Sequence, residues 1–220
     1  MNYFAPALKS GAIHNAAQFK NQEGLSLPEM IETFIKYDKQ LFRMINSDWS
    51  NGFFDWLLPW LRNSNMWYPL YVFLVVLVAV NCKRQVWWWL LFAIATVTIT
   101  DLVSSGIIKQ QVWRLRPCNN PDYTSWIHIL VGYRPQSSSF TSSHATNHFG
   151  IAMYLFLTLR KVFGKWVFIF FIWAGMISFA QVYVGVHYPI DISAGALIGI
   201  LIGYLSGQTY NKAFGLSIPL

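Results

Sequence analysis

A histidine and an aspartate four residues apart are the first candidates for chemistry in this sequence. The spacing of His187 and Asp191 lets the carboxylate accept a hydrogen bond from the imidazole and fix its tautomer. A histidine oriented in this way is suited to act as a nucleophile. On spacing alone, a structural role for the pair is equally well supported.

Two basic residues, Lys109 and Arg116, lie seven residues apart, so both project from one face if the helix continues through them. Pro117 fixes the chain directly after Arg116, and a fixed guanidinium beside an ammonium forms a cradle for phosphate. A lone Lys109 would be better explained as a cation that ends a membrane span and reaches the lipid headgroups. Together, the two cations predict a phosphate site.

The residues Ser142, Ser143 and His144 open a predicted helix. Serine hydroxyls and the unpaired amides of a first helical turn suit an anion. N-capping alone would explain the two serines, but it would not explain the histidine. His148, one turn deeper, also permits a zinc site with the His/Asp pair. We consider zinc the weaker interpretation, because no glutamate accompanies the histidines as in a metalloprotease helix.

The elements that must position these side chains are set by an apolar composition. The chain has 220 residues, of which 55% are hydrophobic and only 11% are charged, whereas a typical soluble domain carries about 25% charged residues. This shortage of charge argues against a water-soluble monomer and excludes intrinsic disorder. The net charge of +7 does not indicate nucleic-acid binding, because the basic residues are scattered between apolar runs.

Five apolar segments indicate membrane crossings: 66–80, 86–108, 145–159, 166–186 and 190–205. We therefore expect an all-α fold, a multi-pass membrane helix bundle of five to six transmembrane helices with an N-terminal interfacial amphipathic helix. Counting crossings places the end of the second segment, the start of the third, the end of the fourth and the start of the fifth on one side of the membrane. The candidates above gather on that side.

The other segments complete the expected organisation. Residues 1–30 contain no apolar run of signal-peptide length and are expected to form a loosely ordered extension. We expect interfacial helices over 31–65, a membrane core over 66–210 and a tail over 211–220.

Small residues recur every four positions in the last apolar segment, at Gly195, Gly199, Gly203 and Gly207. This spacing lets membrane helices approach closely. We favour packing within the chain's own bundle over dimerisation, so a homodimer is compatible with the sequence but not indicated by it.

Three motifs, in order, resemble those of the type 2 phosphatidic acid phosphatases, whose superfamily includes the vanadium haloperoxidases. The first, a lysine separated by six residues from Arg-Pro, is matched fully by residues 109–117 (KQQVWRLRP). The second, usually Pro-Ser-Gly-His, appears at 141–144 as TSSH. The third, usually Ser-Arg followed by a histidine and an aspartate, appears at 180–191 as AQVYVGVHYPID. The resemblance covers residues 35–207.

The resemblance implies a role for each motif residue. His187 would attack phosphorus to form a phosphohistidine, with Asp191 fixing and charging its ring. His144 would protonate the departing oxygen and later activate water. The residues implied to bind the phosphoryl oxygens are Lys109, Arg116, Ser142 and, in place of the usual glycine, Ser143. The scheme requires no metal ion or other cofactor.

The third motif departs from the family at one important position. Gln181 replaces a second phosphate-binding arginine, so one full positive charge is missing. Losing one oxyanion donor typically lowers a rate by about 100- to 1,000-fold, although a glutamine can still donate one hydrogen bond. We expect Arg134 to supply the missing charge, because Pro135 stiffens the loop beside the site, and Arg114 is the alternative.

The expected protein is an integral membrane phosphatase acting on a lipid phosphate or diphosphate of the phosphatidic acid, phosphatidylglycerophosphate or isoprenyl diphosphate class. The Gln181 departure leaves two alternatives, a catalytically weak lipid-phosphate binding protein and a lipid phosphotransferase. The apolar segments disfavour a soluble haloperoxidase. The expected partners are a lipid substrate and the bilayer. We expect the protein in a bacterial inner membrane, and cations in the loops opposite the site favour an active site on the outer face.

Overall fold

A computed structural model describes residues 26–82 and 85–216 of the chain. The chain divides into two compact units, residues 1–39 and residues 40–220. Residues 1–25, which make up most of the expected N-terminal extension, and residues 217–220 of the expected tail lie outside the described residues.

Every regular element in the described ranges is helical, and no strand occurs in them, which confirms the expected all-α fold. Four stretches are long and apolar enough to cross a membrane: Ser64–Asn81, Val86–Gln111, Ser143–Tyr183 and Pro189–Ala213. The helices that make up most of these stretches are α4 (Tyr68–Asn81), α5 (Val86–Asp101), α7 (Ser143–Phe163), α8 (Ile169–Tyr183) and α9 (Pro189–Ala213). The chain is therefore a multi-pass membrane helix bundle.

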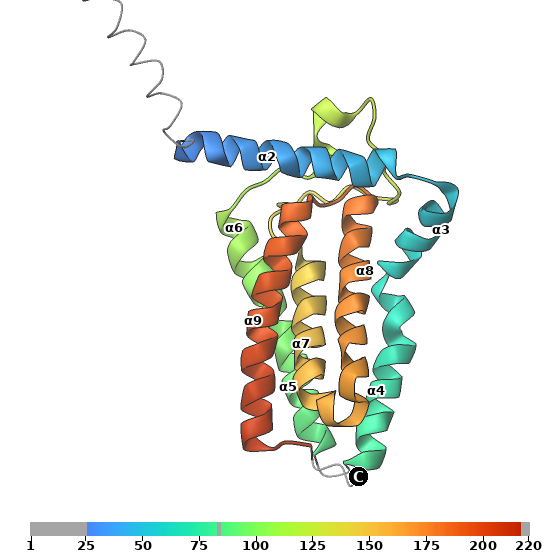
Figure 1. Ribbon diagram of the computed structural model, residues 1–220, viewed down its shortest axis with the longest axis vertical. Helices are drawn as coiled ribbons and strands as arrows, with labels where there is room; N and C mark the ends of the chain where they lie inside the picture. Colours follow the sequence, from blue (N-terminus) through green and yellow to red (C-terminus); the bar gives the residue numbers. More distant parts are fainter. Residues whose placement is uncertain (1–25, 83–84, 217–220) are drawn as a thin grey trace, which may run out of the picture. The chain divides into compact units, whose positions relative to one another are not determined.

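The third stretch holds two helices rather than one. Helix α7 ends at Phe163, and the next residue, Gly164, has a φ of 54°, in the left-handed region that favours glycine. A short 3₁₀ segment, η6 (Gly164–Phe168), then leads into α8, which runs back alongside α7 (Figure 1). The predicted third and fourth segments correspond to these two helices, and the total of five to six crossings stays a prediction.

Helices α7 and α9 form the most closely packed pair of the bundle, with α5 and α8 also against α7. Gly195, Gly199, Gly203 and Gly207 form a glycine ridge along α9, and this ridge lets the two helices pack closely. A Cβ atom at Gly195 would lie 2.8 Å from the carbonyl oxygen of Ser142, and one at Gly199 would overlap the carbonyl oxygen of Thr146. The ridge is thus used inside the chain's own bundle.

Two further helices precede the bundle in sequence. Helix α2 (Leu27–Arg43) lies where an amphipathic helix is predicted, and η1 (Met44–Asp48) follows it. Helix α3 (Gly52–Leu61) begins at Asn51, whose side chain accepts a hydrogen bond from the amide of Phe54 at 3.1 Å. The interfacial position of these helices stays a prediction.

The helix that carries Lys109 does not continue to Arg116, so the condition under which the two residues would share one helical face is not met. A π-helical segment, η3 (Leu102–Ile108), leads into the single turn α6 (Lys109–Gln111), and Val112 is already extended. The backbone beyond this point pairs with another loop: the amide of Ser139 donates to the carbonyl of Arg114 at 2.8 Å. Pro117 also disfavours a helical conformation at the residue before it.

Candidate active site

Contacts between α6, the start of α7, the loop after α8 and the start of α9 bring the three motifs together. The amide of Ser142, at the start of α7, donates to the carbonyl of Asp191 in α9 at 3.1 Å. Lys109 Nζ, in α6, donates to Ser143 Oγ at 2.7 Å. The extended segment after α6 contributes Arg116, which reaches the loop between α8 and α9.

That loop presents His187 in a fixed position. Gly185 has a φ of 86°, and a Cβ atom there would lie 3.1 Å from the carbonyl oxygen of His128, so a larger residue would be both strained and crowded. The backbone amides of Val186 and His187 both donate to the carbonyl of Gln181, at 3.2 Å and 3.3 Å. The His187 side chain is only 3% exposed.

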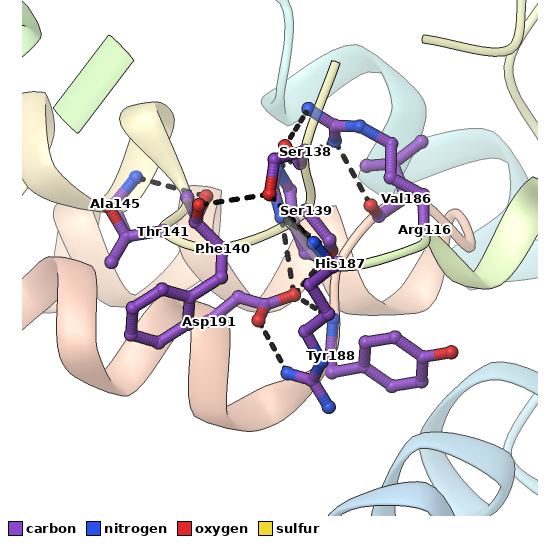
Figure 2. A network of polar contacts seen from close by, with 12 residues as sticks. Arg116, Ser138, Ser139, Phe140, Thr141, Ala145, Val186, His187, Tyr188 and Asp191 are labelled. Atoms are coloured by element: carbon purple, nitrogen blue, oxygen red, sulfur yellow. Dashed lines mark hydrogen bonds and ion pairs between the residues drawn. The ribbon is translucent and has the colours of Figure 1, made fainter. Parts of the chain in front are cut away.

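His187, Asp191 and Ser139 form a buried cluster (Figure 2). Nδ1 of His187 lies 3.6 Å from Oδ2 of Asp191 and 3.4 Å from Oγ of Ser139. The Ser139 hydroxyl donates to the same carboxylate oxygen at 2.5 Å. The serine therefore bridges the histidine and the aspartate.

Arg116 holds the opposite side of the imidazole. Its Nη1 lies 3.0 Å from Nε2 of His187. The other guanidinium contacts are donated to Ser137 Oγ and to the carbonyls of Ser137, Ser138 and Val186, at 2.9 to 3.1 Å. Because a guanidinium only donates, Nε2 must accept, which places the ring proton on Nδ1, facing the Asp191 side. The tautomer is that of a nucleophile acting through Nε2.

Burial controls the ionisation of this pair. It lowers the pKa of His187 from 6.5 to about 4, against the opposing effect of Asp191. It also lowers the pKa of the Arg116 guanidinium, but an arginine stays protonated in proteins. At neutral pH the site therefore holds an uncharged imidazole next to a permanent cation.

Two further groups hold the Asp191 carboxylate. Arg114 Nη1 donates to its Oδ1 at 2.5 Å, and the Tyr188 amide donates to its Oδ2 at 2.9 Å. The guanidinium of Arg114 also lies over the Tyr188 ring, 4.0 Å from its centroid. The alternative offered by the sequence for the missing charge, Arg114, thus contacts the aspartate of the site.

A serine cluster surrounds Lys109. Ser143 Oγ, which accepts from Lys109, also lies 2.9 Å from Ser104 Oγ and 2.8 Å from Ser105 Oγ. Both of these serines lie in the π-helical segment η3, and π-helical turns often mark functional sites. Ser143 therefore contacts Lys109 through its side chain. Glycine, the usual residue of the family motif at this position, could not make this contact.

Ser142 caps α7, with its Oγ accepting from the Ala145 amide at 3.4 Å. His144 lies in the first turn of that helix, and its ring stacks on His148 with a centroid distance of 6.2 Å. His148 is positioned in turn by an edge contact with Trp173 at 5.0 Å and by a 2.8 Å hydrogen bond between its Nδ1 and the carbonyl of His144. The ring of His144 is therefore supported from the bundle side.

The two residues connected with the missing arginine lie in different surroundings. Gln181 is 1% exposed, and its Nε2 is buried without a hydrogen-bond partner in the described part of the chain. Arg134 lies on the exposed loop, where its carbonyl accepts from Gln136 at 3.0 Å. The positive charge of Arg134 acts on Cys118, where it opposes the rise in the thiol pKa that burial causes.

A cleft of about 410 Å³ opens beside His144. It is lined by the segment after α3, including Arg62, Asn63 and Ser64, and by the loop that includes Tyr133. His144 is the motif residue that faces this cleft, so the cleft leads from the surface to the general acid implied by the resemblance.

Two residues at the site were not predicted from the sequence, Ser139 and Arg62. The run of serines at 137–139 carried a signal, since hydroxyls next to a motif are potential tethers. Arg114 was predicted only as an alternative source of the missing charge, and its contact with Asp191 was not predicted, although residues two apart in an extended chain, such as Arg114 and Arg116, share a face. Nothing in the sequence placed Arg62 at the site.

The zinc interpretation finds no ligand set. No group of three or more His, Cys, Asp or Glu side chains in residues 26–82 and 85–216 is arranged to hold a metal ion.

The sequence is similar to those of known lipid phosphatases over most of its length. The family model described as PAP2 superfamily matches residues 86–214. Lipid A 4'-phosphatase of Bacteroides thetaiotaomicron is 34% identical over 80% of this chain and 78% of its own. Undecaprenyl-diphosphatase of Sulfolobus acidocaldarius is 31% identical over 80% of each chain. The crystal structure of Aquifex aeolicus LpxE, 27% identical, superposes with a TM-score of 0.56 and covers 77% of this chain and 93% of its own.

Proposed function

Because this chain belongs to the PAP2 superfamily and is a membrane lipid phosphatase, we propose that it removes a phosphate from a lipid phosphomonoester or diphosphate through a phosphohistidine at His187. The observation that carries this proposal is the buried, unprotonated Nε2 of His187, 3.0 Å from Nη1 of Arg116. A neutral imidazole beside a permanent cation combines a nucleophile with a phosphate-binding group.

In the first step, the Nε2 lone pair of His187 attacks phosphorus, and the bond from phosphorus to the leaving oxygen breaks. His144 gives its proton to that oxygen. The imidazole gains positive character as the N–P bond forms, and the Asp191 carboxylate behind Nδ1 stabilises it.

In the second step, His144 takes a proton from a water molecule as the water oxygen attacks phosphorus. The N–P bond breaks, phosphate leaves and His187 returns to its neutral form. Both residues therefore end each turnover in their starting protonation states.

The phosphoryl oxygens need donors that stay in place through both steps. We propose that Lys109 and Arg116 supply charge to the phosphoryl oxygens, and that Ser142 and Ser143 supply hydrogen bonds. Gln181 adds the donor Nε2, which has no partner in the described residues. Arg134 remains the residue predicted from the sequence to add charge from the exposed loop.

The substrate is proposed to be a lipid whose tail lies in the bundle. An apolar groove of about 380 Å³ between α4, α5 and α7, lined by residues such as Tyr71, Trp89 and Leu155, has the character of a hydrocarbon site. The names of the relatives favour a lipid A-type phosphate or an isoprenyl diphosphate. Phosphatidic acid and phosphatidylglycerophosphate are the other candidate substrates. The proposed location is a bacterial inner membrane, with the site on its outer face.

The test uses purified protein in detergent with lipid A, farnesyl diphosphate and phosphatidic acid, and it measures phosphate release. We expect release from at least one lipid, loss of release in His187→Ala and a phosphorylated His187 detected by mass spectrometry in alkali. His128→Ala is the matched control, because its ring lies outside the cluster around Asp191. Tight lipid binding without release would favour the binding-protein alternative, and transfer of phosphate to an added alcohol would favour the phosphotransferase.

A further inference from the structure

Arg62 shares the cleft with His144, although it precedes the residues that the PAP2 family model matches. It directly follows α3, and its amide donates to the carbonyl of Leu58 at 3.1 Å, which fixes its backbone. Its Nε is buried and has no hydrogen-bond partner within the described ranges. A buried guanidinium nitrogen without a hydrogen-bond partner is costly unless something else accepts its proton.

The charge of Arg62 reaches the site. It adds to the effect of burial in lowering the pKa of Arg116, and it opposes the effect of burial on the pKa of Cys118. Because Arg116 touches the nucleophile, Arg62 lies within electrostatic reach of the reacting phosphorus.

The position of Arg62 relative to His144 indicates which part of a substrate it meets. In the proposed reaction, His144 protonates the leaving oxygen, so the cleft beside His144 receives the leaving group. Asn63 and Ser64 add neutral polar side chains to the same wall, and none of the described residues that line the cleft is acidic. The cleft that would receive the leaving group therefore carries a positive charge, that of Arg62.

From this juxtaposition we infer that Arg62 binds a second phosphate on the leaving group, and so favours lipid diphosphates over lipid monophosphates. The inference rests on the proposed function, since it takes His144 as the general acid. Arginine pairs with phosphate through two parallel hydrogen bonds, which suits an anion held at a fixed distance from the scissile bond.

The test compares Arg62→Gln with wild type on farnesyl diphosphate and on phosphatidic acid, measuring kcat/KM for each. A hydrogen bond to a charged group is usually worth about 10- to 100-fold. We expect a loss of that size on the diphosphate and less than about 3-fold on the monophosphate. Arg62→Lys should recover part of the loss. Arg160→Gln, on an exposed arginine in the last turn of α7, is the matched control.

Equal losses on both substrates, or no loss on either, would overturn the inference. A selective loss in Arg134→Gln instead of Arg62→Gln would also overturn it. These outcomes do not test the proposed function. That proposal is tested by phosphate release by wild type and by the loss of release in His187→Ala. A binding measurement in His187→Ala, with farnesyl diphosphate as the probe, adds a readout without turnover. Arg62→Gln should weaken that binding by about 10-fold or more.

Discussion

Nη1 of Arg116 lies 3.0 Å from Nε2 of His187, on the side of the ring opposite Asp191 (Figure 2). The guanidinium thus assigns the tautomer and covers the nucleophilic atom in the same contact. A phosphoryl group that approaches Nε2 must meet Arg116 as it does so. In the proposed reaction, Arg116 would therefore both bind the phosphate and hold His187 in its reactive tautomer.

Replacing Arg116 with lysine keeps the charge but removes the fork of donors. An ammonium cannot satisfy Nε2 of His187, Ser137 Oγ and the carbonyls of Ser137, Ser138 and Val186 together. We expect kcat/KM for phosphate release to fall by about 100-fold or more. Arg160→Lys, on an exposed residue of α7, controls for the change of residue type. Activity within about 3-fold of wild type would show that charge alone suffices.

The lowered pKa of His187 predicts how stability depends on pH. Between about pH 4 and 6.5, the unfolded chain binds a proton at His187 that the folded chain does not. Stability therefore rises with pH in this window, and it is lost as the pH falls from about 6.5 towards 4. We expect the melting temperature of wild type in detergent to fall more between pH 7 and pH 5 than that of His187→Gln. An equal fall would mean that this histidine titrates normally.

The fold was largely predictable because apolar length and charge-free runs determine where a helix can cross a membrane. The helices α4, α5, α7, α8 and α9 follow those runs closely. The exception is the segment from Lys109 to Arg116, whose helix ends after Gln111, although the shared face considered for the two cations required it to continue. Its backbone pairs with residues 138–139 instead, and such a long-range contact leaves no periodic pattern in the sequence.

The site was predictable only in part, for a similar reason. Spacing indicated the pairing of His187 with Asp191, since both lie near the start of one helix. Arg62 and Ser139 reach the site through the tertiary fold, from segments with no motif. Residue spacing predicts contacts between residues that are close in the sequence. It does not predict contacts between distant loops, which only the structure shows.

Ser139 is expected to act by positioning, because it touches His187 and Asp191 but lies behind the reacting atom. Ser139→Ala removes both contacts while the imidazole and the carboxylate stay. We expect kcat to fall by about 10- to 100-fold, with KM nearly unchanged, because substrate contacts are retained. Ser193→Ala, on an exposed serine of α9 whose hydroxyl donates to the carbonyl of Pro189 in the same helix, should leave kcat unchanged. A rise in KM with kcat intact would assign Ser139 to substrate binding instead.

The glycine ridge of α9 makes a prediction about stability rather than catalysis. A methyl group at Gly199 would overlap the carbonyl oxygen of Thr146 and lie 2.9 Å from the amide of Gly150, both backbone atoms of α7 that cannot rotate away. Gly199→Ala must therefore push α7 and α9 apart, at a cost of about 1–3 kcal/mol or more, and lower the melting temperature in detergent. Gly175→Ala in α8 is the matched control, since a Cβ atom there meets nothing within 4 Å. It should be neutral or slightly stabilising, because alanine favours the helix. If Gly199→Ala kept the wild-type melting temperature but changed the oligomeric state, the ridge would belong to a dimer interface after all.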